Sequence, residues 1–140
     1  MTGVWIALAA VALALAFGGY RKLTDGRAKT VRQSRSLDER RLGAALGSQA
    51  TFVQFSTAVC APCRATHQVL SEVVADSQGV RHVTIDAETR LDLVDQLGIT
   101  RTPTVLLLDA EGVIRNRIVG AARKSEVLNA LNEVDRAAAA

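Results

Sequence analysis

The spacing of hydrophobic and polar positions predicts alternating strands and helices between residues 37 and 134. The β-rich run 51–55 predicts a strand, and the apolar spacing that follows predicts a helix over about 60–76. Residues 81–86 predict a second strand, and 91–97 predict a short helix closed by Gly98. A strand, helix, strand order indicates two parallel strands joined by a crossover.

The C-terminal part has a different pattern. Residues 104–108 are almost continuously apolar, which predicts a central strand covered on both faces. A turn over 109–112 leads to residues 113–119, which are expected to pair back as an antiparallel hairpin. Ser125 is expected to cap a last helix that runs to about Val134. With a further helix expected over 37–46, ending at Gly47, the fold class is α/β, a central mixed sheet flanked by helices.

The first 20 residues contain no charged side chain. An apolar helix of this length roughly spans the ~30 Å hydrocarbon core of a bilayer, and Trp5 and Tyr20 lie near its ends, where such rings favour the headgroup region. A buried core helix would need a polar stripe, which is absent here. The pattern therefore predicts a transmembrane anchor over 1–20, a basic juxtamembrane linker over 21–36 and a folded domain over 37–140.

The charge pattern suggests an orientation for that anchor. Six Lys and Arg residues lie between Arg21 and Arg35, and such clusters tend to remain cytoplasmic or to contact anionic lipid headgroups. We therefore expect a single-pass protein of the cell membrane with its domain in the cytoplasm, the extracytoplasmic side being the alternative. A cleavable signal peptide, cut after Ala16, is disfavoured because no basic residue precedes the apolar run.

Composition excludes several classes of protein. A chain of 140 residues allows one domain and an appendage, and a hydrophobic content of 49% excludes a disordered protein. The net charge of +3 comes from residues 1–41, with eight basic and three acidic residues, whereas 42–140 carry nine basic and eleven acidic ones. This distribution argues against nucleic-acid binding. Arg outnumbers Lys fourteen to three, which is typical of GC-rich bacterial genomes.

The only two cysteines form a Cys60-Ala61-Pro62-Cys63 motif between the first predicted strand and its helix. A thiol at a helix N-terminus is acidified by unpaired backbone N–H groups and the helix dipole. Cys60 is therefore the candidate nucleophile, and Cys63 can resolve a mixed disulfide formed on it. Pro62 suits a first helical turn because a backbone N–H at this position would have no acceptor within the helix, so proline, which lacks the N–H, loses no hydrogen bond.

The cysteine pair also permits other uses. Two ordinary buried cysteines rarely occur at this spacing and junction, and haem attachment would need a histidine where Arg64 stands. A copper or zinc site could use Cys60, Cys63 and His67, although a structural zinc site needs four ligands. No flavin, nicotinamide or phosphate-binding motif is present, so no cofactor is expected beyond the cysteine pair, and its electrons must come from another protein.

The chain resembles the thioredoxin-like family over about residues 37–134. The motifs that carry the resemblance are Phe52-Val53-Gln54-Phe55, Cys60-Ala61-Pro62-Cys63-Arg64, Val83-Thr84-Ile85-Asp86, Gly98-Ile99, Thr102-Pro103-Thr104 and Gly120. The resemblance implies the thioredoxin fold and a disulfide oxidoreductase. It also implies that Thr102–Pro103 is a cis bond that faces the cysteines and binds an extended substrate strand.

The sequence departs from the family pattern at four positions. Val59 replaces the tryptophan that usually precedes the first cysteine, and Gln68 stands where a helix-kinking proline is common. Gln54 replaces a buried aspartate, and His82 aligns with its companion lysine. The usual base for Cys63 is thus missing. His82 is a possible proton relay because histidine titrates near neutral pH.

These observations lead to a membrane-tethered thiol–disulfide oxidoreductase as the first hypothesis. In the cytoplasm it would act as a reductase of protein disulfides, because the cytosol keeps exposed thiols reduced. A thioredoxin-reductase-like protein or a membrane electron donor would supply its electrons. Facing outward, it would oxidise or isomerise disulfides or serve cytochrome maturation. The alternative hypothesis is a metal chaperone using Cys60, Cys63 and His67. A redox-inert adaptor would not need both thiols.

Overall fold

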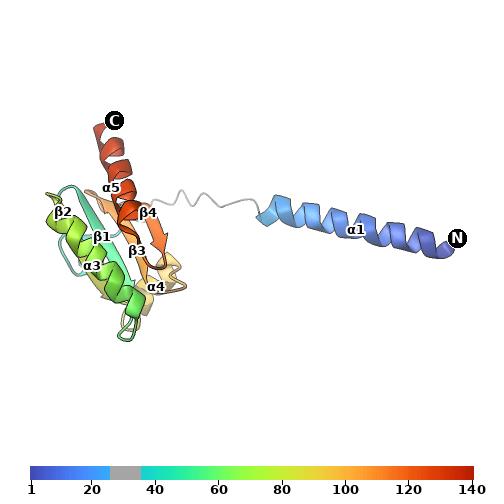
Figure 1. Cartoon of the computed structure of the whole chain (residues 1–140), viewed down its shortest axis with the longest axis horizontal. Coiled ribbons are helices and arrows are strands. Elements are labelled where there is room, and N and C mark those ends of the chain that lie inside the picture. The colour runs from blue at the N-terminus through green and yellow to red at the C-terminus, as the bar shows by residue number, and fades with distance from the viewer. Residues whose placement is uncertain (26–35) are drawn as a thin grey trace. The chain divides into compact units, whose positions relative to one another are not determined.

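A computed structural model describes residues 1–25 and 36–140, the first range without the side chains beyond Phe17. The chain divides into two compact units, Met1–Gln33 and Ser34–Ala140. The first contains helix α1, Thr2–Asp25, whose apolar side chains up to Phe17 are exposed (Figure 1). Most of the basic linker predicted over 21–36 lies outside the described residues.

The prediction of a transmembrane anchor over 1–20 is not supported by the structure. A membrane span needs about 20 consecutive, predominantly apolar residues. Within residues 1–25 and 36–140, none of the helices combines the length and the apolar character needed to cross a bilayer.

The second unit is built on a four-stranded sheet with the strand order β2-β1-β3-β4 (Figure 1). β1 and β2 are parallel, whereas β3 pairs antiparallel with both β1 and β4. The predicted parallel pair, central strand and hairpin are therefore confirmed. The strands are β1 (Ala50–Ser56), β2 (Val80–Asp86), β3 (Thr104–Asp109) and β4 (Ile114–Val119), and the main helices are α3 (Ala61–Ala75), α4 (Leu91–Leu97) and α5 (Lys124–Ala139).

Side chains of the two central strands alternate between two hydrophobic clusters, as the period of two in a strand requires. Phe52 and Leu107 belong to the cluster that also holds Leu70 and Val73 of α3 and the buried residues of α5. Phe55 and Leu106 belong to the other cluster, which holds the buried leucines of α4. The sheet is thus covered on both faces, and β3 is buried along its whole length, which explains its almost unbroken apolar sequence.

The helix predicted over 37–46 is much shorter in the structure. α2 spans only Glu39–Leu42, with the Asp38 carboxylate accepting from the Arg41 amide at its start. Gly43 ends it in the left-handed conformation, with φ of 73°, which glycine adopts without steric cost. The prediction that this helix ends at Gly47 was therefore wrong, because the first of the two glycines terminates it.

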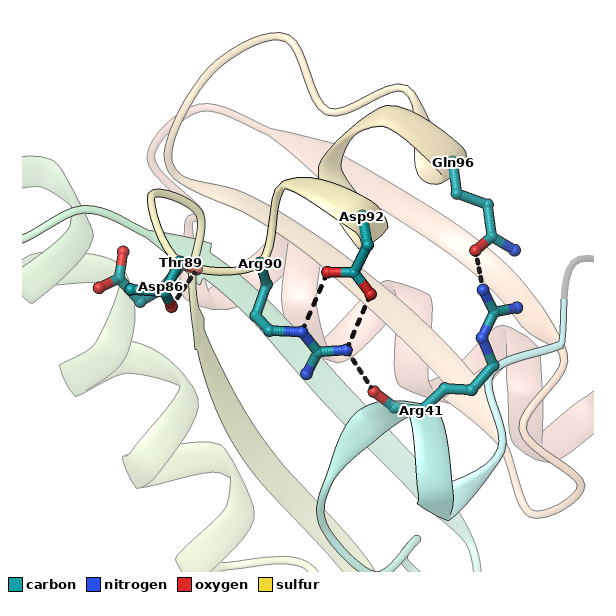
Figure 2. Close-up of polar contacts among 6 residues, drawn as sticks. All are labelled: Arg41, Asp86, Thr89, Arg90, Asp92 and Gln96. Carbon is teal, nitrogen blue, oxygen red and sulfur yellow. Dashed lines mark hydrogen bonds and ion pairs between the residues drawn. The ribbon is translucent and has the colours of Figure 1, made fainter.

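Polar contacts tie the segment around α2 to α4 (Figure 2). The Arg90 guanidinium donates to the Arg41 carbonyl oxygen at 2.8 Å and pairs with the Asp92 carboxylate at 3.1 Å. The Arg41 guanidinium in turn donates to the side-chain oxygen of Gln96. Leu37 and Leu42 meanwhile bury their side chains in the cluster beneath α4. These contacts close the sheet face opposite α3 and α5.

The last helix starts one residue earlier than predicted. α5 begins at Lys124, and the Glu126 carboxylate accepts from the Arg123 backbone N–H at 3.2 Å. The prediction that Ser125 caps this helix was wrong. Ser125 already lies inside the first turn, where its hydroxyl cannot occupy the capping position.

Candidate active site

The two cysteines lie where β1 turns into α3. Cys60 is the N-cap of α3 in an extended conformation, with φ of −146° and ψ of 95°, and Pro62 lies in the first turn. The Cys60 Sγ atom accepts from the Cys63 backbone N–H at 3.2 Å, and the two sulfurs form a disulfide of 2.04 Å. Cys60 thus has the position in which unpaired helical N–H groups and the helix dipole stabilise a thiolate.

The two cysteines differ in their access to solvent. Cys63 is buried, with 4% of its surface exposed, whereas Cys60 is partly exposed. Val59, directly before Cys60, is 97% exposed. A protein disulfide approaching this surface therefore meets Cys60 first. The geometry favours Cys60 for the attack on substrate and Cys63 for the internal step.

Thr102 and Pro103 lie at the same end of the sheet. Their peptide bond is cis, as the family resemblance implied. Thr104, the next residue, pairs with Phe55 near the end of β1 from which α3 starts, and the Pro103 carbonyl accepts from the Gly120 N–H at 2.8 Å. Thr102 and Pro103 do not line the cavity described below, so their role as substrate contacts stays a prediction.

Gln54 links the cysteine helix to β2. Its side chain is buried, with 1% exposed, and its Nε2 donates to the Cys63 carbonyl oxygen at 2.8 Å. Its Oε1 atom lies 3.0 Å from His82 Nε2. Because the amide oxygen can only accept, His82 must donate through Nε2–H. Gln54 thus fixes the backbone of Cys63 and the orientation of His82 with two neutral hydrogen bonds.

His82, the predicted proton relay, contacts the Gln54 amide and neither cysteine sulfur. Its ring is partly buried, and burial, followed by the nearby charge of His67, lowers the pKa of His82 to about 4. The imidazole is therefore neutral at pH 7. Its contact leads to the Gln54 amide and from there to a carbonyl oxygen of Cys63, not to the sulfur. No direct contact between His82 and a cysteine sulfur is therefore seen among these hydrogen bonds, and the proton-relay role of His82 stays a prediction.

A cavity of about 190 Å³ lies beside the cysteines. Both cysteines, Arg64 and His67 line it, together with Gln54, Thr84 and the loop 56–58. Within the described part of the chain, no three His, Cys, Asp or Glu side chains are grouped so that they could hold a metal ion. The alternative site made of Cys60, Cys63 and His67 is therefore not found.

Two features of the site were not foreseen from the sequence. Gln54 was identified only as a residue unable to take a proton, and its hydrogen bond to Cys63 was missed. The only function considered for His67 was that of a metal ligand, and the structure places it, exposed to solvent, at the edge of the cysteine cavity. Its spacing of four residues from Cys63 was the available signal, because such residues share a helix face.

Comparison with known proteins agrees with this geometry. The family model described as Thioredoxin matches residues 38–133, more than half of the chain. No protein of curated function matches the sequence. Among solved structures, oxidised mitochondrial thioredoxin 3 from Saccharomyces cerevisiae shares 21% identity over 61% of this chain and 79% of its own, with a TM-score of 0.55.

Two further structures show the same fold. The long form of spinach chloroplast thioredoxin f shares 21% identity over 69% of this chain and 78% of its own, with a TM-score of 0.59. Fasciola hepatica thioredoxin shares 17% identity over 62% and 82%, with a TM-score of 0.55. Together with the matched family model and the paired cysteines, these comparisons show that the chain belongs to the thioredoxin family and is a thiol–disulfide oxidoreductase.

Proposed function

We propose that the protein is a reductase of protein disulfides. The observation that carries the proposal is the pairing of an accessible Cys60 at a helix N-cap with a buried Cys63 within disulfide distance. A helix N-terminus lowers the pKa of a thiol, so a thiolate is available for attack near neutral pH. The buried partner is protected from outside thiols and is placed for the internal reaction.

The reaction takes place in two exchange steps. The Cys60 thiolate attacks one sulfur of a substrate disulfide, the substrate S–S bond breaks, and the other substrate sulfur leaves with the electron pair and is protonated. The Cys63 thiolate then attacks Cys60 Sγ, which forms the Cys60–Cys63 disulfide and releases the second substrate sulfur. The substrate gains two electrons, and the cysteine pair loses two.

A second protein must then reduce the Cys60–Cys63 disulfide. The chain has no other cysteine that could pass on electrons. We therefore expect a dithiol partner, such as a thioredoxin-reductase-like protein or a membrane electron donor, to attack the accessible Cys60. We expect the exposed Val59 to supply an apolar contact for partners, and the segment at Thr102 and Pro103 to bind their extended backbone.

The reductase proposal is tested by the equilibrium of the full-length chain in glutathione redox buffers, with Cys60→Ser and Cys63→Ser as controls. A two-electron midpoint near about −270 mV supports a reductase, whereas one at about −120 to −180 mV indicates an oxidase or isomerase. Catalysed reduction of insulin by the reduced wild-type chain, and by neither variant, would establish turnover. Absence of a reversible couple would refute the proposal.

A reductase needs a reducing compartment, and on this ground we place its site of action in the cytoplasm. A membrane-impermeant alkylating reagent tests the assignment, because Cys60 is the accessible thiol. Cys60 of intact cells should remain unmodified and should react after lysis. Modification in intact cells would place the domain on the extracytoplasmic side and favour an oxidising role.

A further inference from the structure

His67 lies on α3 one turn after Cys63, and both side chains reach the cavity of about 190 Å³ beside the cysteines. Residues four apart share one face of a helix. A water molecule occupies about 30 Å³ in the liquid, so a cavity of this size has room for several. The polar lining supplied by Gln54, Thr57 and Thr84 provides partners for such water. Water in the cavity can therefore connect the His67 ring with the sulfur of Cys63.

The contacts of Ser71 favour one position for the proton of neutral His67. The single hydroxyl proton of Ser71 is donated to the His67 carbonyl oxygen at 2.8 Å. Ser71 Oγ also lies 3.4 Å from His67 Nδ1, and with its proton already used it can only accept there. With Ser71 in this arrangement, neutral His67 carries its proton on Nδ1 and has a lone pair on Nε2, which can act as a base.

His67 has no competing base in this cavity. Among the described residues that line it, none is a carboxylate, and His82 lines the neighbouring groove instead. The Nε2–H of His82 is already committed to Gln54. Its ring centroid lies 4.7 Å from that of His67, so the two imidazoles are in contact. A positive charge on His67 disfavours one on His82.

The remaining ionisable groups that surround His67 are the two cysteines, Arg64 on α3 and Arg81 on β2. The other described residues lining the two spaces around His67, including Ala44 and Ala45, are uncharged. Arg64 favours a thiolate at Cys63, which assists transfer of the proton away from the sulfur.

We propose that His67 accepts the Cys63 proton, through cavity water, in the internal step of the reductase reaction. This inference rests on the proposed function. The Cys63 S–H proton passes to His67 Nε2, the thiolate attacks Cys60 Sγ of the mixed disulfide, and the departing substrate sulfur takes the electron pair. That sulfur is then protonated by the imidazolium or by solvent, which returns His67 to its neutral form.

The size of the effect follows from thiol ionisation. A thiol with an ordinary pKa of about 8.5 is roughly 3% ionised at pH 7, so complete assistance gains at most about 30-fold. We expect His67→Gln to slow the internal step about tenfold at pH 7. The difference should disappear at about pH 9, because the thiol then ionises without a base.

The experiment follows the reduced full-length chain as it reacts with 5,5′-dithiobis(2-nitrobenzoate) in a stopped-flow instrument. Attack by Cys60 releases the first coloured thiolate, and attack by Cys63 on the resulting mixed disulfide releases the second. We expect His67→Gln to leave the first phase unchanged within about twofold and to slow only the second, with a pH profile displaced to alkaline values. His67 is exposed, so the substitution should not affect folding, which circular dichroism will verify.

The matched control is the double variant His67→Gln/Gln68→His. It has the same composition as the wild type but moves the imidazole to an exposed position that does not line the cavity. It should be as slow as the single variant. A fast second phase in the double variant, or an unchanged pH profile in His67→Gln, would overturn the role assigned to His67 and leave the proposed function standing. Absence of the first phase in the wild type would refute the proposed function and this inference with it.

Discussion

Acidification should destabilise the domain through His82, and His82→Gln should remove this effect. The partly buried imidazole donates from Nε2 to the Gln54 amide oxygen at 3.0 Å. Burial, followed by the charge of His67, lowers the pKa of His82 from 6.5 to about 4. A glutamine at this position retains an N–H donor of similar reach and cannot titrate.

The direction of the effect follows from proton binding. The unfolded chain binds the His82 proton more tightly than the folded domain does, so stability is complete above about pH 6.5 and falls as the pH approaches 4. The full difference in pKa corresponds to about 3.4 kcal/mol at about 1.36 kcal/mol per pH unit. Because the ring is only partly buried, solvent screening reduces the expected loss to about 1–2 kcal/mol.

Urea unfolding at pH 7.5 and pH 4.5 measures this loss. Circular dichroism is the suitable probe, because the only tryptophan and tyrosine, Trp5 and Tyr20, lie outside the thioredoxin domain. The wild type should lose about 1–2 kcal/mol more than His82→Gln between the two pH values, since the other groups titrate in both proteins. Equal losses, or an NMR titration of the His82 ring with a midpoint near 6.5, would refute the argument.

Two further predictions concern the core and a turn. Leu106 is fully buried in β3, so Leu106→Ala should lower the free energy of unfolding, measured by urea titration, by about 2–5 kcal/mol. Leu128 is 40% exposed, so Leu128→Ala should lower it far less. Burial alone would raise the pKa of Asp109, but hydrogen bonds from the Val113 amide and Arg115 outweigh it and lower that pKa. Asp109→Asn should therefore lower the free energy of unfolding by about 1–3 kcal/mol at pH 7. Its difference from wild type should shrink as the pH falls below about 4, because the wild-type carboxylate is then protonated. A difference that stays constant with pH would contradict a contribution from the ionised carboxylate.

The sheet was predictable because the sequence determines it through short-range patterns. The apolar run 104–108 is buried on both faces of β3, and the turn after it imposes an antiparallel hairpin. The α2 segment was not predictable in the same way. Leu37, Leu42 and Leu46 have helical spacing, yet they pack beneath α4 because the chain turns at Gly43. Hydrophobic spacing indicates which side chains are buried but does not determine the backbone between them.

The active site was predictable only as far as it is local in sequence. The Cys60–Cys63 motif and its junction between β1 and α3 lie within one continuous segment. The link between Gln54 and His82 joins residues 28 positions apart, and it depends on the parallel register that places Phe52 beside His82. The direction in which each amide and imidazole atom points depends on these contacts, so the hydrogen bond between Gln54 and His82 could not be read from the sequence.

Gln54→Glu tests whether this neutral network is required. The substitution nearly preserves shape, but it replaces the N–H donor that faces the Cys63 carbonyl oxygen at 2.8 Å with a carboxyl oxygen. An ionised carboxylate would bring two acceptors together in a buried position, so the new carboxyl should keep its proton and its pKa should rise. A group with a raised pKa in the folded state stabilises at low pH and loses that contribution as the pH rises.

The pH dependence of this variant should therefore be opposite to that of the wild type. Relative to wild type, Gln54→Glu should lose about 1–3 kcal/mol at pH 8, the cost of an unsatisfied buried group, and should recover toward pH 4.5. Gln54→Met is the matched control, because it removes both hydrogen bonds without adding a titratable group and should show a smaller dependence on pH. If Gln54→Glu were as stable as wild type at pH 8, a charged group would be tolerated beside Cys63, and the site would not depend on a neutral hydrogen-bond network.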